Sequence, residues 1–270
     1  MWFLALALGT AQATELVYRW TPGRTLVYDV EVVRTFQSGL TLPEAQGFPG
    51  MRATLSCEVG AAEQERLPMQ CTLGSMARIT IRDQAVAQVT PFEPPLDTVR
   101  VTWTPTGRIE DFGLVRPEGM TEAAERDITS FEYWVGELVS ALEVELPQGG
   151  EPRRGKWRAS GPMLSLQVPS SDFHLGSTGI RYQLESESED GVWIVSKGQA
   201  GAMAAETLTS HQQLSLIRKF EGRAHFDPAR GLLVENVQHM TDVGTAGSAF
   251  FYYQGPLGHS LYATLRESSP

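Results

Sequence analysis

Apolar and polar residues alternate along much of the chain, which is the pattern of β-strands that bury one face. The clearest runs place apolar residues at Leu26, Tyr28, Val30 and Val32, at Val99, Val101 and Trp103, and at Ile180, Tyr182 and Leu184. Polar residues lie between them, as expected for antiparallel sheets with one face toward solvent. Several runs are long, which favours a strongly curved sheet or barrel over a compact sandwich.

One segment has a different period. Between Thr121 and Glu143, apolar residues recur every three or four positions, at Ile128, Phe131, Val135, Leu138 and Leu142. This spacing predicts one stripe of an amphipathic helix. Pro147 and the pair Gly149–Gly150 end the pattern. Such a stripe needs an apolar surface to cover, so we expect the helix to lie across one face of a sheet.

The helix separates two segments of similar design. Residues 103–107 and 226–231 both combine an aromatic residue, a proline turn and a glycine before a returning strand. A degenerate duplication is one explanation and chance similarity the other. We therefore predict a mostly β fold, with two related antiparallel halves forming a curved or incompletely closed barrel and one central amphipathic helix. The predicted parts are a signal peptide (1–13), a first β half (14–116), a linking helix (117–146) and a second β half (147–266).

Two hairpins can be written in register. A bend centred on Gln64 places Cys57 opposite Cys71, with Leu55 opposite Leu73 and Val59 opposite Met69. Directly opposed residues are close enough for a disulfide after a small adjustment; two buried free thiols in a cytosolic protein are the alternative. In the second hairpin, a tight turn at Asp190–Gly191 predicts that Trp193 and Val195 share a face with Tyr182.

The N-terminus resembles a secretory signal peptide. A short apolar run, Trp2 to Leu8, precedes Ala11-Gln12-Ala13, so cleavage is expected before Thr14. An N-terminal strand or a misassigned start is the alternative, because no Lys or Arg precedes the apolar run. With the disulfide, this pattern predicts an exported protein, periplasmic or extracellular. No other stretch reaches the roughly 18 apolar residues of a membrane-spanning helix, so we predict no transmembrane span.

The net charge of the chain argues against one class of binding partner. The chain has 22 Lys plus Arg against 32 Asp plus Glu, a net charge of −10. No basic run offsets this balance along the sequence, so a nucleic-acid partner is not expected.

Catalytic motifs are not evident. Residues 150–156 match the start of a phosphate-binding loop, but Trp157 stands where Ser or Thr should hold magnesium. No G-x-S-x-G elbow occurs. All five histidines lie in the second half, and His225 with Asp227 would share one face of a strand. That pair is a weak candidate for metal ligands, since a site needs at least three converging groups. We predict no cofactor.

The most distinctive candidate site is an aromatic run. Phe250, Phe251, Tyr252 and Tyr253 supply large rings to both faces of one predicted strand, between two glycine-rich segments. Such a strand can simply be buried on one side and half-covered on the other. It can also form the wall of a hydrophobic pocket or a docking edge.

Four short motifs in residues 146–243 carry a family resemblance: Leu146-Pro147, Gly155-Lys156-Trp157, Phe226-Asp227 and Gly231-Leu232. This run resembles exported, often lipid-anchored bacterial β-rich proteins of unknown function. The resemblance implies a cell-envelope location and a β scaffold, and it transfers no catalytic residue. This chain departs from the pattern by lacking the cysteine that would carry the lipid.

We therefore expect a non-enzymatic exported or cell-envelope protein that binds an apolar small molecule or an envelope protein. The alternative is an extracellular hydrolase or metal-dependent enzyme with a histidine-bearing site in the second half. A membrane-spanning barrel is a third hypothesis, which the amphipathic helix and the polar C-terminal residues oppose.

Overall fold

A computed structural model describes residues 14–36, 48–82, 85–160, 173–175, 179–204, 213–248 and 251–268. These residues form one α-helix and thirteen strands. The elements are β1 (Thr25–Phe36), β2 (Phe48–Val59), β3 (Leu67–Arg82), β4 (Ala85–Pro91), β5 (Thr98–Trp103), β6 (Ile109–Leu114), α1 (Glu122–Ser140), β7 (Lys156–Arg158), β8 (Phe173–Leu175), β9 (Arg181–Ser188), β10 (Gly191–Ala204), β11 (Gln213–Asp227), β12 (Leu232–Ser248) and β13 (Phe251–Ser268).

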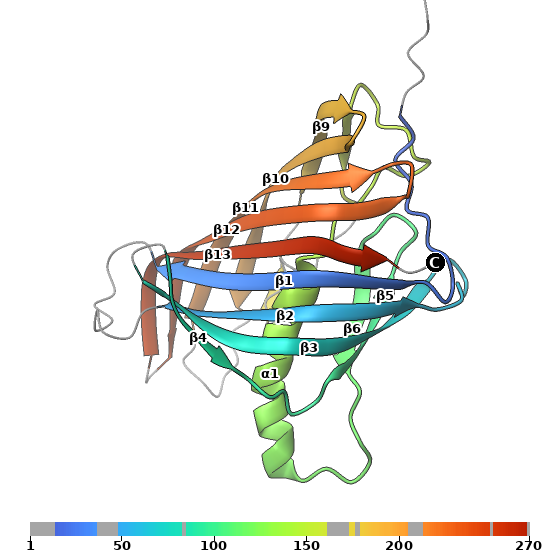
Figure 1. Cartoon of the computed structure of the whole chain (residues 1–270). Coiled ribbons are helices and arrows are strands. Elements are labelled where there is room, and N and C mark those ends of the chain that lie inside the picture. Colours follow the sequence, from blue (N-terminus) through green and yellow to red (C-terminus); the bar gives the residue numbers. More distant parts are fainter. Residues whose placement is uncertain are drawn as a thin grey trace, which may run out of the picture.

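All the strands belong to one antiparallel sheet. Its order is β6-β5-β3-β2-β1-β13-β12-β11-β10-β9-β7, with β4 beside β3 and β8 beside β10. We call β1–β6 the first limb and β7–β13 the second limb. They meet where β1 pairs with β13. Within the described residues the end strands β6 and β7 do not pair with each other, so the sheet is curved but not closed, as predicted (Figure 1). That the two halves arose by duplication stays a prediction.

The helix packs on the concave face of this sheet. Its main contacts are with β1, β2, β6 and β13, and it crosses behind β1, β2 and β3 in Figure 1. Gly136 allows a close approach to β6, because a Cβ there would lie 2.7 Å from the Phe112 ring. Ile128, Phe131, Val135 and Leu138 are buried, which confirms the predicted stripe. The helix ends at Ser140, three residues before the end of the helical pattern at Glu143 and six before the end of the predicted linking helix at residue 146.

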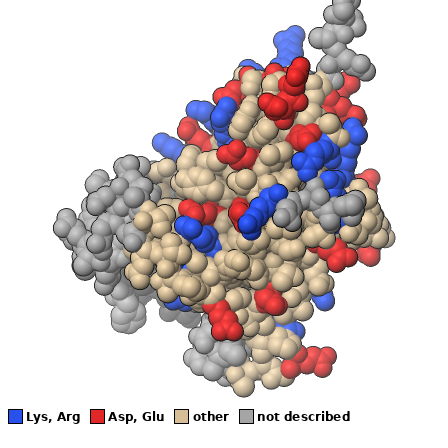
Figure 2. Space-filling view, viewed as in Figure 1, with Lys and Arg blue, Asp and Glu red and all other residues tan. Residues whose placement is uncertain are grey.

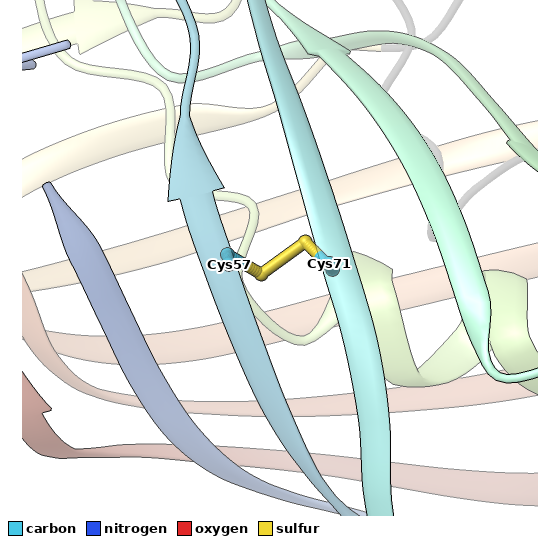
Figure 3. The surroundings of a disulfide bond; sticks show 2 residues. All are labelled: Cys57 and Cys71. Atoms are coloured by element: carbon cyan, nitrogen blue, oxygen red, sulfur yellow. A yellow bond between two sulfur atoms is a disulfide. The ribbon is translucent and has the colours of Figure 1, made fainter. Parts of the chain in front are cut away.

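The predicted alternation is confirmed in the core. The buried faces of β1 and β5 carry the expected residues, Leu26, Tyr28, Val30 and Val32 on β1 and Val99, Val101 and Trp103 on β5. In the β2–β3 hairpin, Cys57 pairs with Cys71, Leu55 with Leu73 and Val59 with Met69. The two sulfurs form a disulfide with an S–S distance of 2.13 Å (Figure 3). Both cysteines are buried.

The β9–β10 hairpin differs from its prediction. Its two turn residues are Glu189 and Asp190, and a bulge leaves Glu185 unpaired between Ser186, which pairs with Trp193, and Leu184, which pairs with Ile194. One extra residue reverses the faces of everything beyond it. Val192, Ile194 and Ser196 are therefore buried on the Tyr182 face, and the prediction for Trp193 and Val195 is wrong.

Candidate ligand-binding face

The concave face of the second limb has two ends. We call the part beside the β9–β10 turn the near end. The far end comprises residues 198–204 of β10, 213–217 of β11, 241–248 of β12 and 251–257 of β13. At the near end, large side chains fill the concave face, including Tyr182, Ile194, Phe226, Leu233 and Met240, all at most 2% exposed.

A buried segment completes the near end. Residues 141–146, here called the strap, follow α1 as a turn and then an irregular segment, and each is at most 5% exposed. Four side chains donate to strap carbonyls: Asn236 Nδ2 to Ala141 O at 2.8 Å, Gln238 Nε2 to Glu143 O at 3.0 Å, Tyr18 Oη to Val144 O at 3.0 Å, and Trp157 Nε1 to Glu145 O at 2.7 Å. Such bonds satisfy polar groups that burial would otherwise leave unpaired. These hydrogen bonds therefore hold the strap in place against the sheet.

Two carboxylates of the strap are buried. Glu143 Oε1 accepts a hydrogen bond from Ile109 N at 3.0 Å, and Glu145 accepts bonds from the backbone N–H and the hydroxyl of Ser160. Burial, and after it the charge of nearby Glu143, raises the pKa of Tyr182 well above its usual value. The pKa of Tyr18 is also raised, with burial again the main cause. These carboxylates anchor backbone at the near end.

A clamp fixes α1 to β1. The Arg34 guanidinium donates to Glu137 Oε2 at 2.8 Å and lies over the rings of Tyr133 and Trp134, with its carbon 4.7 and 4.0 Å from the ring centroids. Planar arginine suits such combined ion-pair and stacking geometry. Burial raises the pKa of Tyr133, to which Glu137 adds. The clamp pins the helix beside β13, because Arg34 pairs with His259 in the sheet.

The far end has a different set of inward positions. The register of β10 with β11 is regular, so residues 198, 200, 202 and 204 follow Val192, Ile194 and Ser196 on the concave face. These positions are Gly198, Ala200, Ala202 and Ala204 on β10, and the inward positions of β12 are Asp242, Gly244, Ala246 and Ser248. On β11, between these two strands, the paired inward positions are Leu214, Leu216 and Arg218. The main contacts of α1 do not include β10, β11 or β12. On β10 and β12 the concave face therefore changes from bulky to small residues, whereas β11 has bulky inward residues at the far end.

The aromatic run borders this far end. The β12–β13 register is unbroken from Glu235 to Ser248, which puts Phe251 and Tyr253 in line with the buried inward residues Leu261 and Ala263. Tyr252 takes the opposite, convex face, in line with Tyr262. Phe250 lies outside the described residues, as do the side chains of the other three. Register thus divides the predicted site into concave and convex positions.

The two residues of the predicted metal pair, His225 and Asp227, make other contacts in the structure. His225 stacks on Trp193 at 4.7 Å between ring centroids, and its Nε2 lies 3.0 Å from Asp190 O. Asp227 Oδ1 accepts from the backbone N–H groups of Ala229 and Arg230, which closes the β11–β12 turn. In the part of the chain that is described, no three His, Cys, Asp or Glu residues come together as metal ligands.

The convex face carries a shallow groove of about 720 Å³ across β1, β2 and β13. Its charged groups neutralise one another: Glu31 pairs with Arg52 at 3.4 Å, and Asp29 with Arg266 at 3.5 Å. Acidic and basic side chains are interspersed over this face of the molecule (Figure 2). The groove thus has no net charge preference for a ligand.

Sequence patterns gave no sign of several of these features. The strap lies within the predicted helix, because Leu142 continues the apolar stripe. The partners of Arg34 and Asn236 lie about 100 residues away in the chain. In the sequence, the small inward residues of β12 were visible only as part of the glycine-rich segment before the aromatic run.

Comparison with known proteins identifies a fold and no family. No family model matches the sequence, and no curated protein matches it. Among solved structures, the chain is similar to one described as "Lipid-protein interactions in lipovitellin", with a TM-score of 0.52 and 11% sequence identity. The match covers 93% of this chain and 26% of that one, so this chain spans about a quarter of that protein's length. At this identity the likeness shows a shared fold.

Proposed function

We propose that the protein is a non-enzymatic carrier or receptor that binds a lipid-like apolar ligand on the concave face at the far end. The observation that carries this proposal is that most inward positions of β10 and β12 switch from large residues at the near end to Gly, Ala and Ser at the far end. They flank the apolar inward positions Leu214 and Leu216 of β11. Small residues leave room above a sheet, and Phe251 and Tyr253 would form an apolar wall beside it.

Rigidity of the near end supports the same function. The strap holds the near end of the second limb, and the disulfide joins β2 to β3 in the first limb, so the far end need not be filled for the protein to fold. Ligand sites are concave, mainly apolar and largely preformed. A curved sheet with a helix on its concave face meets this description. The structural neighbour's description concerns lipid–protein interaction, which is compatible with such a ligand.

Export belongs to the proposal too. The disulfide favours an oxidising compartment. No helix in the described part of the chain is long and apolar enough to cross a membrane. The predicted signal peptide, residues 1–13, lies outside the described residues. We propose a periplasmic or extracellular location, which N-terminal sequencing of the protein from its own host would test.

The direct test is a binding measurement with a fluorescent fatty-acid analogue. Phe251→Ala and Tyr253→Ala remove rings from the concave positions and should each weaken binding about tenfold, since a buried aromatic side chain contributes at least 1.4 kcal/mol. Tyr252→Ala is the matched control, because its position is convex, and should leave the affinity unchanged. Native mass spectrometry of the protein from its host should show a retained lipid as added mass.

Two outcomes would contradict the proposal. Equal effects at residues 251, 252 and 253 would mean that the concave face has no special part in binding. A bound protein, with no lipid mass and no binding of the analogue, would indicate a partner-docking surface instead.

A further inference from the structure

A row of cations crosses the convex face at the β7 edge of the sheet. Arg158 on β7 pairs with Arg181 on β9, and Arg181 pairs with Lys197 on β10. All three side chains are exposed. Like charges placed directly opposite each other on adjacent strands destabilise a sheet. This basic row, Arg158–Arg181–Lys197, therefore costs the fold some stability.

The basic row lines a groove of about 540 Å³, and Lys156 is a fourth cation at its wall. The protein has three lysines, Lys156, Lys197 and Lys219, and all three are exposed here, with Lys219 one strand further on β11. The fold thus gathers from separate strands a basic surface that no run of the sequence displays.

Few acids oppose this surface. Lys197 pairs with Glu221 at 3.0 Å, and both side chains are more than 60% exposed, so the pair is weak. No described carboxylate lies within ion-pair distance of Lys156, Arg158 or Arg181. The neighbouring convex groove, by contrast, pairs its charges internally. Three cations thus remain available to an outside anion.

An exposed aliphatic side chain lies on the same face. Ile217 is two residues from Lys219 along β11 and is 50% exposed, the largest value among the exposed large hydrophobic residues. A cationic surface with an adjoining apolar side chain suits the boundary between lipid head groups and acyl chains, where both kinds of group are stabilised.

We propose that the basic row, with Lys156, Lys219 and Ile217, docks the protein on a membrane surface rich in anionic phospholipid. This goes beyond binding an apolar ligand, because it concerns the convex face and needs no ligand on the concave one.

Charge geometry favours a membrane over a long soluble polyanion. The protein carries a net charge of −10, which would oppose wrapping by nucleic acid. The basic row is at one end of the sheet order, the end marked by β9 in Figure 1. An edge can meet a plane while much of the rest of the protein points away from it. Glu221, which pairs with Lys197, is the described acidic residue within ion-pair distance of the row.

Docking in this way also sets an orientation. The acidic residues Glu185, Glu187 and Glu189 lie toward the β9–β10 turn, at the opposite end of β9 from Arg181. Attraction at one end of the strand and repulsion at the other would turn the near end away from the membrane. The far end would then lie closer to the lipid.

Vesicle co-sedimentation of the full chain tests the proposal. Vesicles of phosphatidylcholine containing about one third phosphatidylglycerol should bind the protein at about 0.05 M salt, and binding should fall steeply at about 0.5 M. Phosphatidylcholine alone should bind it weakly. The variant R158Q/R181Q should lower partitioning about thirtyfold, since each cation near such a surface contributes about fivefold.

The matched control is R66Q/R100Q, which removes two exposed cations from the first limb and should bind as the wild type does. A stability measurement guards against misfolding: R158Q/R181Q should unfold at an equal or higher urea concentration than the wild type, because it removes like-charge repulsion. Ile217→Ser should lower partitioning about fivefold at either salt concentration.

Three results would overturn the proposal. Equal binding by R158Q/R181Q and the control would exclude the basic row. Equal binding to neutral and anionic vesicles would exclude charge recognition. Binding of inorganic phosphate or polyglutamate at the row without vesicle binding would assign it to a soluble anion or an acidic protein. None of these readouts uses the fatty-acid analogue, so failure here is distinct from failure of the concave-face proposal.

Discussion

The near and far ends of the second limb belong to the same strands but are built in opposite ways. At the near end the inward positions are closely packed, and Asn236 and Gln238 hold the strap against the sheet by hydrogen bonds to its carbonyls. At the far end the inward positions of β10 and β12 are Gly, Ala and Ser except for Asp242, and those of β11 are Leu214 and Leu216, followed by Arg218.

The difference separates stability from function. Residues that are well packed and hydrogen-bonded carry the free energy of folding, whereas binding regions are drawn from less stable parts of a structure. One continuous sheet can do both if its most closely packed part is confined to one end. The predictions below therefore compare substitutions at the two ends.

The largest expected effect is the loss of a near-end aromatic residue. Phe226 is fully buried and meets the Tyr18 ring edge-on at 5.3 Å. Phe226→Ala should lower the free energy of unfolding by about 3–5 kcal/mol, from lost burial and the cavity left behind. Urea unfolding measures this. A loss under about 1 kcal/mol would mean that the near end is not the stable one.

Removal of the disulfide should cost somewhat less. The bond closes a loop of 14 residues in sequence separation within the first limb. Cys57→Ala combined with Cys71→Ala should lower the free energy of unfolding by about 3 kcal/mol, mainly through the unfolded state. The wild type under a reductant should match the double variant, and the affinity for the fatty-acid analogue should not change. Insensitivity of the wild type to reductant would refute the bond.

Local patterns predicted local structure well. The Cys57–Cys71 hairpin could be written in full because its alternation and turn lie within 25 residues. The β9–β10 faces could not be predicted, because the bulge at Glu185 changes the register without changing the composition. The strap could not be predicted, for a non-local reason: Leu142 continues a helical stripe, and hydrogen-bond donors to the strap such as Asn236 and Gln238 lie about 95 residues away in the sequence.

Part of the candidate site could be predicted from local sequence, and part of it depends on contacts between distant strands. The aromatic run is visible as four consecutive rings. Their division into concave and convex positions required the unbroken β12–β13 register, which no single segment of sequence contains. The basic row is less visible still, since its three cations come from three strands.

The next smaller effect is expected at alkaline pH, which should lower the free energy of unfolding. Burial raises the pKa of Tyr18, Tyr28 and Tyr182 above 10, so the folded state retains these phenol protons when the unfolded chain loses them. Stability is therefore complete below about pH 10 and falls above it, by up to about 1.4 kcal/mol per pH unit for each tyrosine. Urea unfolding between about pH 9 and about pH 11.5 gives the slope. Tyr28→Phe should make the slope shallower; an unchanged slope would assign the effect to other groups.

The smallest effect on stability, and the sharpest test of the comparison, comes from one substitution made at both ends. Ala224 is 3% exposed at the near end, and Ala224→Leu should overpack the core and cost about 1–3 kcal/mol. Ala202→Leu places the same added volume at an inward position of the far end, where the proposed space should accept it at a cost near zero. It should instead weaken binding of the fatty-acid analogue, because the leucine occupies ligand volume. Equal destabilisation at the two positions would show that the far end is as filled as the near end, and the ligand would then have to bind elsewhere.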